Sequence, residues 1–200
     1  MCKDAASYAD NDMRTQRTMF FRSHSKEAKE AQEPGHEAGR SPEAALFDEA
    51  NGLHKRWYFE RRLHEEVIRS TRYGHVFALI LWEPRLLLGE VLGDEAIARV
   101  GEVINDGLRQ TDLAAQFDGA RFAALLPECA LNTARTVAFR MKNSLASRVR
   151  SGPGTWRAGL AIFPDEGVDE ATLLHVAARK LSEDVGLAAP PTLVPPTPDD

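Results

Sequence analysis

The stretch that decides the fold of this chain is Gln116-Phe117-Asp118-Gly119-Ala120-Arg121-Phe122. The Asp-Gly pair at its centre lies between two apolar runs, residues 113–115 and 122–126. This arrangement is typical of a β-hairpin, because glycine adopts the positive φ of a tight turn without steric strain. The sequence therefore predicts two antiparallel strands joined at Asp118-Gly119.

Regular hydrophobic patterns on both sides of the hairpin predict an alternation of helices and strands. Apolar residues at helical spacing predict four helices, over residues 56–71, 97–108, 134–145 and 173–181. A continuous apolar run and an alternating segment predict two further strands, at residues 76–82 and 156–163. The order of these elements contains the split βαβ pattern of ferredoxin-like folds. We therefore expect an α/β (α+β) domain in which helices surround a central, mostly antiparallel sheet with a βαββαβ core.

The two ends of the chain differ in composition from this central part. Residues 1–43 are polar apart from Met19-Phe20-Phe21, and residues 187–200 are rich in proline. Polar segments bury too little apolar surface to offset the entropy lost on ordering, and proline-rich segments favour extended conformations. We expect a flexible N-terminal arm over 1–43, a folded domain over 44–186 and a disordered tail over 187–200. The alternatives are a partner-binding patch in the arm and a docking motif in the tail.

The overall composition argues against several classes of protein. The formal net charge of -5 gives no electrostatic reason to bind nucleic acid or an anionic membrane. No apolar run approaches the roughly 18 residues of a membrane-spanning helix, and the first residues lack the apolar core of a signal peptide. The two cysteines, Cys2 and Cys129, are too few for a disulfide framework. We expect a cytoplasmic protein without nucleic-acid or membrane partners.

Three motifs, in the right order and spacing, resemble the GGDEF domain, the family of diguanylate cyclases that join two GTP molecules into cyclic di-GMP. Residues 48–59 resemble the family's first motif, Asp-x-Leu-Thr-Gly-Leu-x-Asn-Arg-Arg-x-Phe. Residues 89–94 resemble Gly-His-x-x-Gly-Asp, with Glu90 in place of the histidine. Residues 157–164 resemble a later strand, Ser-Ile-Gly-Ile-Ala followed by proline. The resemblance implies a GGDEF-like, nucleotidyl-cyclase fold in a bacterial signalling protein.

The positions that would hold metal in this family carry other residues here. Joining nucleotides requires two divalent cations held by carboxylates near the triphosphate. The family takes these ligands from an Asp-x-Asp after the first strand, which reads Glu83-Pro84-Arg85 here, and from the acidic pair of its signature. The signature itself reads Asp118-Gly119-Ala120-Arg121-Phe122, with Ala120 and Arg121 at the acidic positions. Because Arg121 stays protonated, it would place positive charge where a cation should lie.

The resemblance also implies the loss of nucleotide-binding groups. The connection from Arg85 to Gly89 is several residues shorter than the family's phosphate- and guanine-binding loop, and Asp94 alone remains of the guanine-reading residues. Val185 stands where a phosphate-neutralising lysine is expected. We therefore expect no enzymatic activity, no catalytic residue and no cofactor, with Glu83 and Asp94 as vestiges. The alternative is an active cyclase or other nucleotide-binding enzyme that uses Mg²⁺ and atypical ligands around these two residues and Asp118.

A second motif with binding chemistry lies five residues before the signature. Arg109-Gln110-Thr111-Asp112 resembles the family's remote product-binding site, Arg-x-x-Asp. Arginine offers a planar fork to phosphate or to a guanine edge, and aspartate accepts hydrogen bonds from guanine N1-H and N2-H. The resemblance implies a cyclic di-GMP receptor that binds through Arg109 and Asp112. The alternatives are a structural role, in which Arg109 caps the preceding helix and Asp112 begins a strand, or a module that binds a signalling protein or a second copy.

Overall fold

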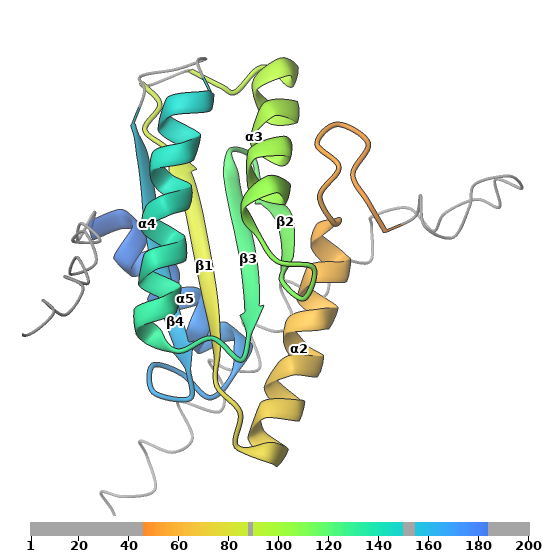
Figure 1. The fold of residues 1–200 in the computed structure, drawn as a ribbon, viewed down its shortest axis with the longest axis vertical. Coiled ribbons are helices and arrows are strands. Elements are labelled where there is room, and N and C mark those ends of the chain that lie inside the picture. Colours follow the sequence, from red (N-terminus) through yellow and green to blue (C-terminus); the bar gives the residue numbers. More distant parts are fainter. Residues whose placement is uncertain (1–45, 88–89, 150–154, 184–200) are drawn as a thin grey trace, which may run out of the picture. The chain divides into compact units, whose positions relative to one another are not determined.

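Four antiparallel strands form the sheet at the centre of the fold (Figure 1). The computed structural model describes residues 46–87, 90–149 and 155–183. The strands lie in the order β2-β3-β1-β4, with bounds β1 (Phe77–Pro84), β2 (Leu113–Asp118), β3 (Arg121–Pro127) and β4 (Trp156–Phe163). The central strand β1 is antiparallel to both neighbours, with Phe77 opposite Pro127 on β3 and opposite Phe163 on β4. The expected antiparallel sheet is confirmed.

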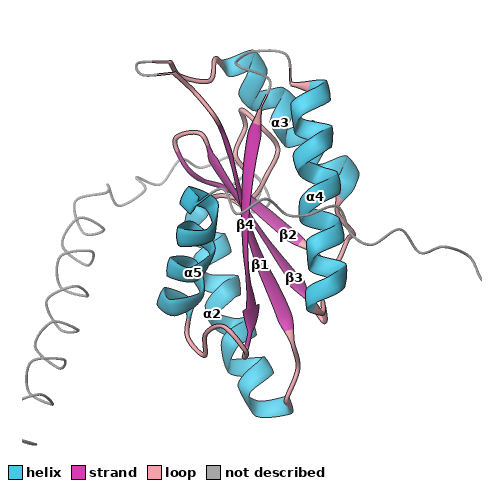
Figure 2. Ribbon diagram, turned by 90° about the vertical axis from the view of Figure 1, so that its left-hand side faces the viewer, coloured by secondary structure: helices cyan, strands magenta, loops and turns pink. Residues whose placement is uncertain are grey.

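Helices cover both faces of the sheet (Figure 2). On one face lie α3 (Asp94–Gly107) and α4 (Leu131–Arg148), and on the other lie α2 (Arg56–Tyr73) and α5 (Glu170–Glu183). Each begins or ends within a few residues of its predicted position, and α2 ends where Gly74 adopts a left-handed conformation with φ 69°. The order of β1, α3, β2, β3, α4 and β4 is the predicted βαββαβ core.

The apolar run of β1 is explained by the two cores that it separates. Ala78, Ile80 and Trp82 pack against α3 and α4. Phe77, Leu79 and Leu81 pack against α2 and α5. Because successive side chains of a strand point to opposite faces of the sheet, a strand covered on both faces must be apolar at nearly every position.

The predicted hairpin joins β2 and β3 at the expected turn. Gly119 has a φ of 40°, and the strand register shifts between Gln116 and Asp118, so the hairpin contains a bulge that the sequence pattern did not predict. The side-chain amide of Gln116 donates a hydrogen bond to the carbonyl of Gly119, 2.5 Å away. This bond holds the turn against its own first strand.

An irregular segment closes the free edge of β2 ahead of α2. Phe47 bridges to His54, and His54 forms a parallel bridge to Ala115 on β2. The buried side chain of Asn51 donates to the side-chain oxygen of Gln116 at 2.7 Å. The first motif of the sequence analysis thus covers a sheet edge and contacts the hairpin.

Several expectations fall on residues that the structure does not describe. They are the arm over 1–43 with its Met19–Phe21 patch, the tail over 187–200, Gly89 of the second motif, and Val185. The domain boundaries therefore stay predictions. Among the described residues, no helix is both long and apolar enough to cross a bilayer.

Candidate functional site

At the end of β1 lies a cluster of charged side chains that come from all four strands of the sheet. Glu83 accepts a hydrogen bond from Arg121 of β3 at 3.4 Å and another from Arg157 of β4 at 3.0 Å. Strand register explains this convergence, since Trp82 is opposite Phe122 on β3 and Glu83 is opposite Arg157 on β4. We call Glu83, Arg121, Arg157 and the nearby Asp118 the Glu83 cluster.

The charges of the Glu83 cluster balance within the protein. Each carboxylate oxygen of Glu83 pairs with a different guanidinium, and Arg121 also donates to Asp118 at 3.4 Å. The side chains of Glu83, Arg121 and Arg157 are only 24%, 29% and 27% exposed, so solvent screens these ion pairs less than surface pairs. The Nε–H groups of both arginines are buried and donate to no partner among the described residues. The cluster is therefore held together mainly through Glu83.

The Glu83 cluster does not fit a divalent cation. A cation would have to displace two guanidinium groups from Glu83, and Arg121 would remain beside it as a fixed positive charge. Ala120, at the other acidic position of the signature, has no ligand atom on its side chain. Within residues 46–87, 90–149 and 155–183 there is no group of three or more His, Cys, Asp or Glu side chains that is placed to hold a metal ion.

Asp94 lies apart from the Glu83 cluster in the hydrogen-bonding network. It is the first residue of α3 and is exposed, and within the described residues no hydrogen bond or ion pair joins it to Glu83 or Asp118. An acidic side chain in this position interacts favourably with the partial positive charge at a helix N-terminus. The carboxylate of Glu90 accepts from the Leu87 amide at 2.8 Å, which closes the short connection ahead of α3. The three residues expected around an atypical metal site are thus only partly brought together.

Arg109 and Asp112 form a tight turn between α3 and β2. The amide of Asp112 donates to the carbonyl of Arg109 at 3.0 Å, and the amide of Arg109 donates to the Asp112 carboxylate at 3.0 Å. The Arg109 side chain is exposed, and among the described residues its guanidinium makes no hydrogen bond or ion pair. The turn therefore presents a cation to solvent and holds the neighbouring carboxylate through its own main chain.

A second arginine, missed by the sequence analysis, lies close to this turn. Arg140 of α4 donates to the carbonyl of Gly107, the last residue of α3, at 2.6 Å. One hypothesis from the sequence was that Arg109 caps the C-terminus of this helix. In the structure, Arg140 makes the capping hydrogen bond instead. A cation at a helix C-terminus neutralises the partial negative charge of the last carbonyls. No local signal in the sequence identifies Arg140, because it lies 33 positions after Gly107 and the two residues are brought together only by the packing of α4 on α3.

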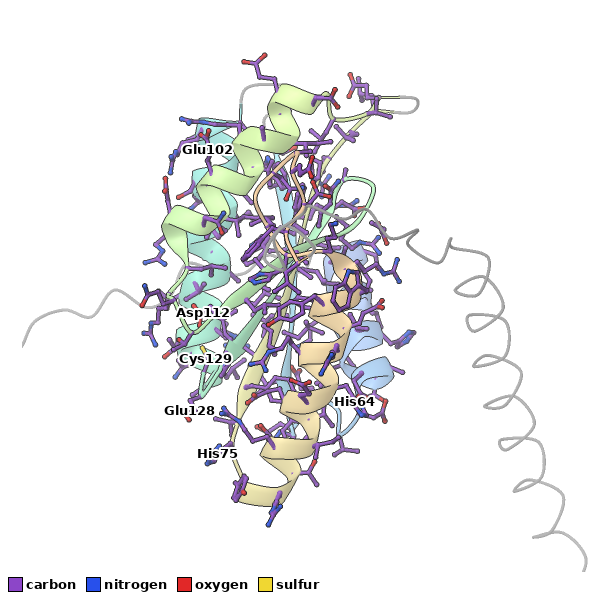
Figure 3. All side chains as sticks on the ribbon, turned by 90° about the vertical axis from the view of Figure 1, so that its right-hand side faces the viewer. His64, His75, Glu102, Asp112, Glu128 and Cys129 are labelled. Carbon is purple, nitrogen blue, oxygen red and sulfur yellow. The ribbon has the colours of Figure 1, made fainter. Side chains whose placement is uncertain are left out.

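Cys129 lies beneath the Arg109-Asp112 turn (Figure 3). Burial raises the pKa of the Cys129 thiol, and the negative charge of Asp112 raises it further, whereas Arg109 lowers it. The thiol is therefore neutral at physiological pH, and it packs in the core cluster of α3 and α4.

Comparison with known proteins identifies the family of this domain. The family model described as "Diguanylate cyclase, GGDEF domain" matches residues 45–184. Diguanylate cyclase DgcP of Pseudomonas aeruginosa is 30% identical over 138 residues, which cover 64% of this chain and 21% of DgcP. Response regulator PleD of Caulobacter vibrioides is 28% identical over 108 residues, covering 51% of this chain and 24% of PleD. The chain thus spans only about a fifth to a quarter of these curated relatives.

Solved structures show the same fold at low sequence identity. The GGDEF domain of DgcB from Caulobacter crescentus, crystallised in complex with c-di-GMP, superposes with a TM-score of 0.61 at 20% identity and covers 76% of this chain and 92% of its own. The FimX GGDEF domain of Pseudomonas aeruginosa superposes with a TM-score of 0.62 at 15% identity, covering 70% of this chain and 93% of its own. With the family model matching most of its length, this chain belongs to the GGDEF domain family.

Proposed function

We propose that this GGDEF domain is catalytically inactive and acts as a receptor for cyclic di-GMP through Arg109 and Asp112. The observation that carries the first half is the pairing of Glu83 with both Arg121 and Arg157. Phosphoryl transfer between nucleotides depends on cations that neutralise charge developing on the triphosphate. A carboxylate already neutralised by two guanidinium groups cannot serve that purpose without breaking its cluster.

The geometry of the Arg109-Asp112 turn supports the second half. The exposed guanidinium of Arg109 suits a phosphate oxygen or a guanine edge. One carboxylate oxygen of Asp112 accepts from the Arg109 amide, and the other can accept from guanine N-H groups. Arg140 adds a second cation nearby. The DgcB domain of the same fold was crystallised with c-di-GMP, which makes this the first ligand to test.

Calorimetric titration of the full chain with cyclic di-GMP tests the receptor. We expect saturable binding that Arg109→Ala weakens by at least tenfold, because the substitution removes a charge-assisted contact. Arg179→Ala is the matched control, since Arg179 is an exposed arginine of α5 on the opposite face of the sheet. The absence of binding, or equal binding by the Arg109 variant, would reject the receptor and leave a domain that acts through protein contacts.

Incubation of the same protein with GTP and Mg²⁺, and separately Mn²⁺, tests the inactivity. We expect no cyclic di-GMP by chromatography. Metal-dependent formation of cyclic di-GMP that Glu83→Gln abolishes would establish the alternative, an active cyclase with atypical ligands. The two experiments are independent, because one measures binding at the Arg109-Asp112 turn and the other measures turnover at the Glu83 cluster.

A further inference from the structure

The C-terminal end of α3 carries an anion where a cation would be favoured. Asp106 lies in the last turn of α3, and this turn contains no basic residue. The free carbonyls of a helix C-terminus already present a partial negative charge, so a carboxylate beside them is unfavourable. The Arg109-Asp112 turn follows α3 directly. An anionic ligand at this turn would therefore lie close to charge of its own sign.

Two arginines of α4, which lies beside α3, offset this charge (Figure 1). Arg140 donates to the main-chain carbonyl of Gly107 at 2.6 Å, and Arg148 donates to the carboxylate of Asp106 at 2.8 Å. Helix α4 contains no acidic residue, so neither arginine has a competing carboxylate within its own helix. Two successive residues at the end of α3 are thus each bound by a separate cation.

We propose that Arg148 is a positioning residue of the ligand site, which acts by neutralising Asp106. The inference rests on the proposed receptor function, and it adds a residue that acts through a neighbour rather than by contact with the ligand. Without Arg148, the Asp106 carboxylate would repel the phosphates of a dinucleotide. It would also compete with the ligand for Arg140, whose guanidinium is bound to the adjacent residue.

Asp106 is close enough to the ligand turn for its charge to affect binding. Residues three positions apart, such as Asp106 and Arg109, lie within about 11 Å of each other. For an unpaired carboxylate about 10 Å from a doubly charged dinucleotide in water, Coulomb's law corresponds to roughly a threefold loss of affinity at about 10 mM salt. Salt at about 0.5 M shortens the Debye length to a few Å and should abolish most of this loss.

The exposure of the Asp106–Arg148 pair separates this effect from folding. The side chains of Asp106 and Arg148 are 62% and 38% exposed. Ion pairs with this much solvent contact contribute little to stability, so loss of the pair should leave the domain folded. A change in affinity would then report on charge at the ligand turn rather than on damage to the helix packing.

Calorimetric titration of the full chain with cyclic di-GMP at about 10 mM salt tests the proposal. We expect Arg148→Ala to weaken binding about threefold and Arg148→Lys, which keeps the charge, to bind like the wild type. The double variant Arg148→Ala/Asp106→Asn should regain the wild-type affinity, because the unpaired anion is gone. Arg99→Ala is the matched control, since it breaks the exposed Arg99–Glu102 pair one turn earlier in α3 and should leave the affinity nearly unchanged.

The double variant distinguishes an electrostatic role of Arg148 from a structural one. If Arg148 merely held α4 against α3, removing Asp106 as well would not restore binding, and that result would overturn the proposal. Equal binding by Arg148→Ala and the wild type would overturn it too, as would a loss that is the same at about 0.5 M salt. A wild type that binds no cyclic di-GMP would reject the receptor and this inference together, whereas the other outcomes leave the receptor standing.

Discussion

Glu83 shows how one residue position changes the chemistry of a site. The Glu83 carboxylate accepts hydrogen bonds from Arg121 and Arg157, so its charge is neutralised within the protein. These bonds also link β1 to β3 and to β4. Removing the carboxylate leaves two guanidinium groups close together without a counter-charge, and this is costlier than the loss of one exposed ion pair.

At this scale, we expect Glu83→Ala to lower the free energy of unfolding by about 1–2 kcal/mol, a value reduced by the partial exposure of the cluster. Urea unfolding monitored by circular dichroism measures this. Glu102→Ala, which breaks the exposed Arg99–Glu102 pair on α3, serves as the control and should change the free energy by less than about 0.5 kcal/mol. Equal effects of the two substitutions would contradict a stabilising role for the Glu83 cluster.

His54 provides a prediction on pH dependence. Burial lowers the pKa of His54 below its ordinary value of 6.5, and the positive charge of Arg62 lowers it further, although the hydrogen bond to the Ala114 carbonyl opposes the shift. The unfolded chain therefore takes up a proton at higher pH than the folded protein does. The contribution of neutral His54 to the free energy of unfolding is therefore complete above pH 6.5, and it is lost as the pH falls from there through the lower pKa of the folded state.

We expect His54→Phe to reduce the loss of stability between pH 7.5 and pH 5.5, because phenylalanine keeps the ring stack and does not titrate. Urea unfolding at both pH values measures this, and an NMR titration of the His54 ring gives its pKa directly. A folded-state pKa at or above 6.5 would show that burial does not control this residue.

At the scale of elements, close packing between α3 and the segment before α2 depends on a glycine. A Cβ at Gly101 would collide with the main-chain oxygen of Asn51, and Asn51 in turn holds Gln116 of the hairpin. The first motif, α3 and the hairpin are therefore packed as one unit, and glycine is required because backbone lies directly against the helix.

We expect Gly101→Ala to destabilise the domain by about 2–4 kcal/mol through overpacking against backbone. A destabilised Gly101 variant would point to the collision, because alanine in a helix interior normally stabilises a protein by about 1 kcal/mol relative to glycine. Gly93→Ala is a suitable control, since a Cβ there meets no atom within 4 Å. Thermal unfolding of both variants decides the point, and a stabilised Gly101 variant would show that the loop moves away at little cost.

At the scale of the whole molecule, the Arg109-Asp112 turn lies where α3 connects to β2, and Arg140 of α4 joins the last turn of α3. A ligand that binds there only in the folded state stabilises the domain by mass action.

Cyclic di-GMP at one hundred times its dissociation constant should raise the free energy of unfolding by about 2.7 kcal/mol, as for any ligand that binds only the folded state. A thermal shift assay of the full chain measures this, and a tenfold weaker Arg109→Ala variant should gain about 1.4 kcal/mol at the same ligand concentration. An undiminished gain in this variant would place the ligand elsewhere on the domain.

The sequence determined the elements, because hydrophobic period and turn chemistry are local properties of the chain. The spacing of Phe59, Leu63 and Val67 predicted α2, and Asp118-Gly119 predicted the hairpin, both of which are confirmed. The substitution of arginine at position 121 was also readable directly. These inferences required no knowledge of which strand lies beside which.

Only the tertiary structure decided the partners of the charged side chains. Glu83 and Arg157 are 74 residues apart, and they meet because β1 and β4 pair in one particular register. Arg140 reaches Gly107 because α4 packs on α3. Electrostatic interactions depend on distance in space rather than along the chain, and that distance is fixed by sheet register and helix packing.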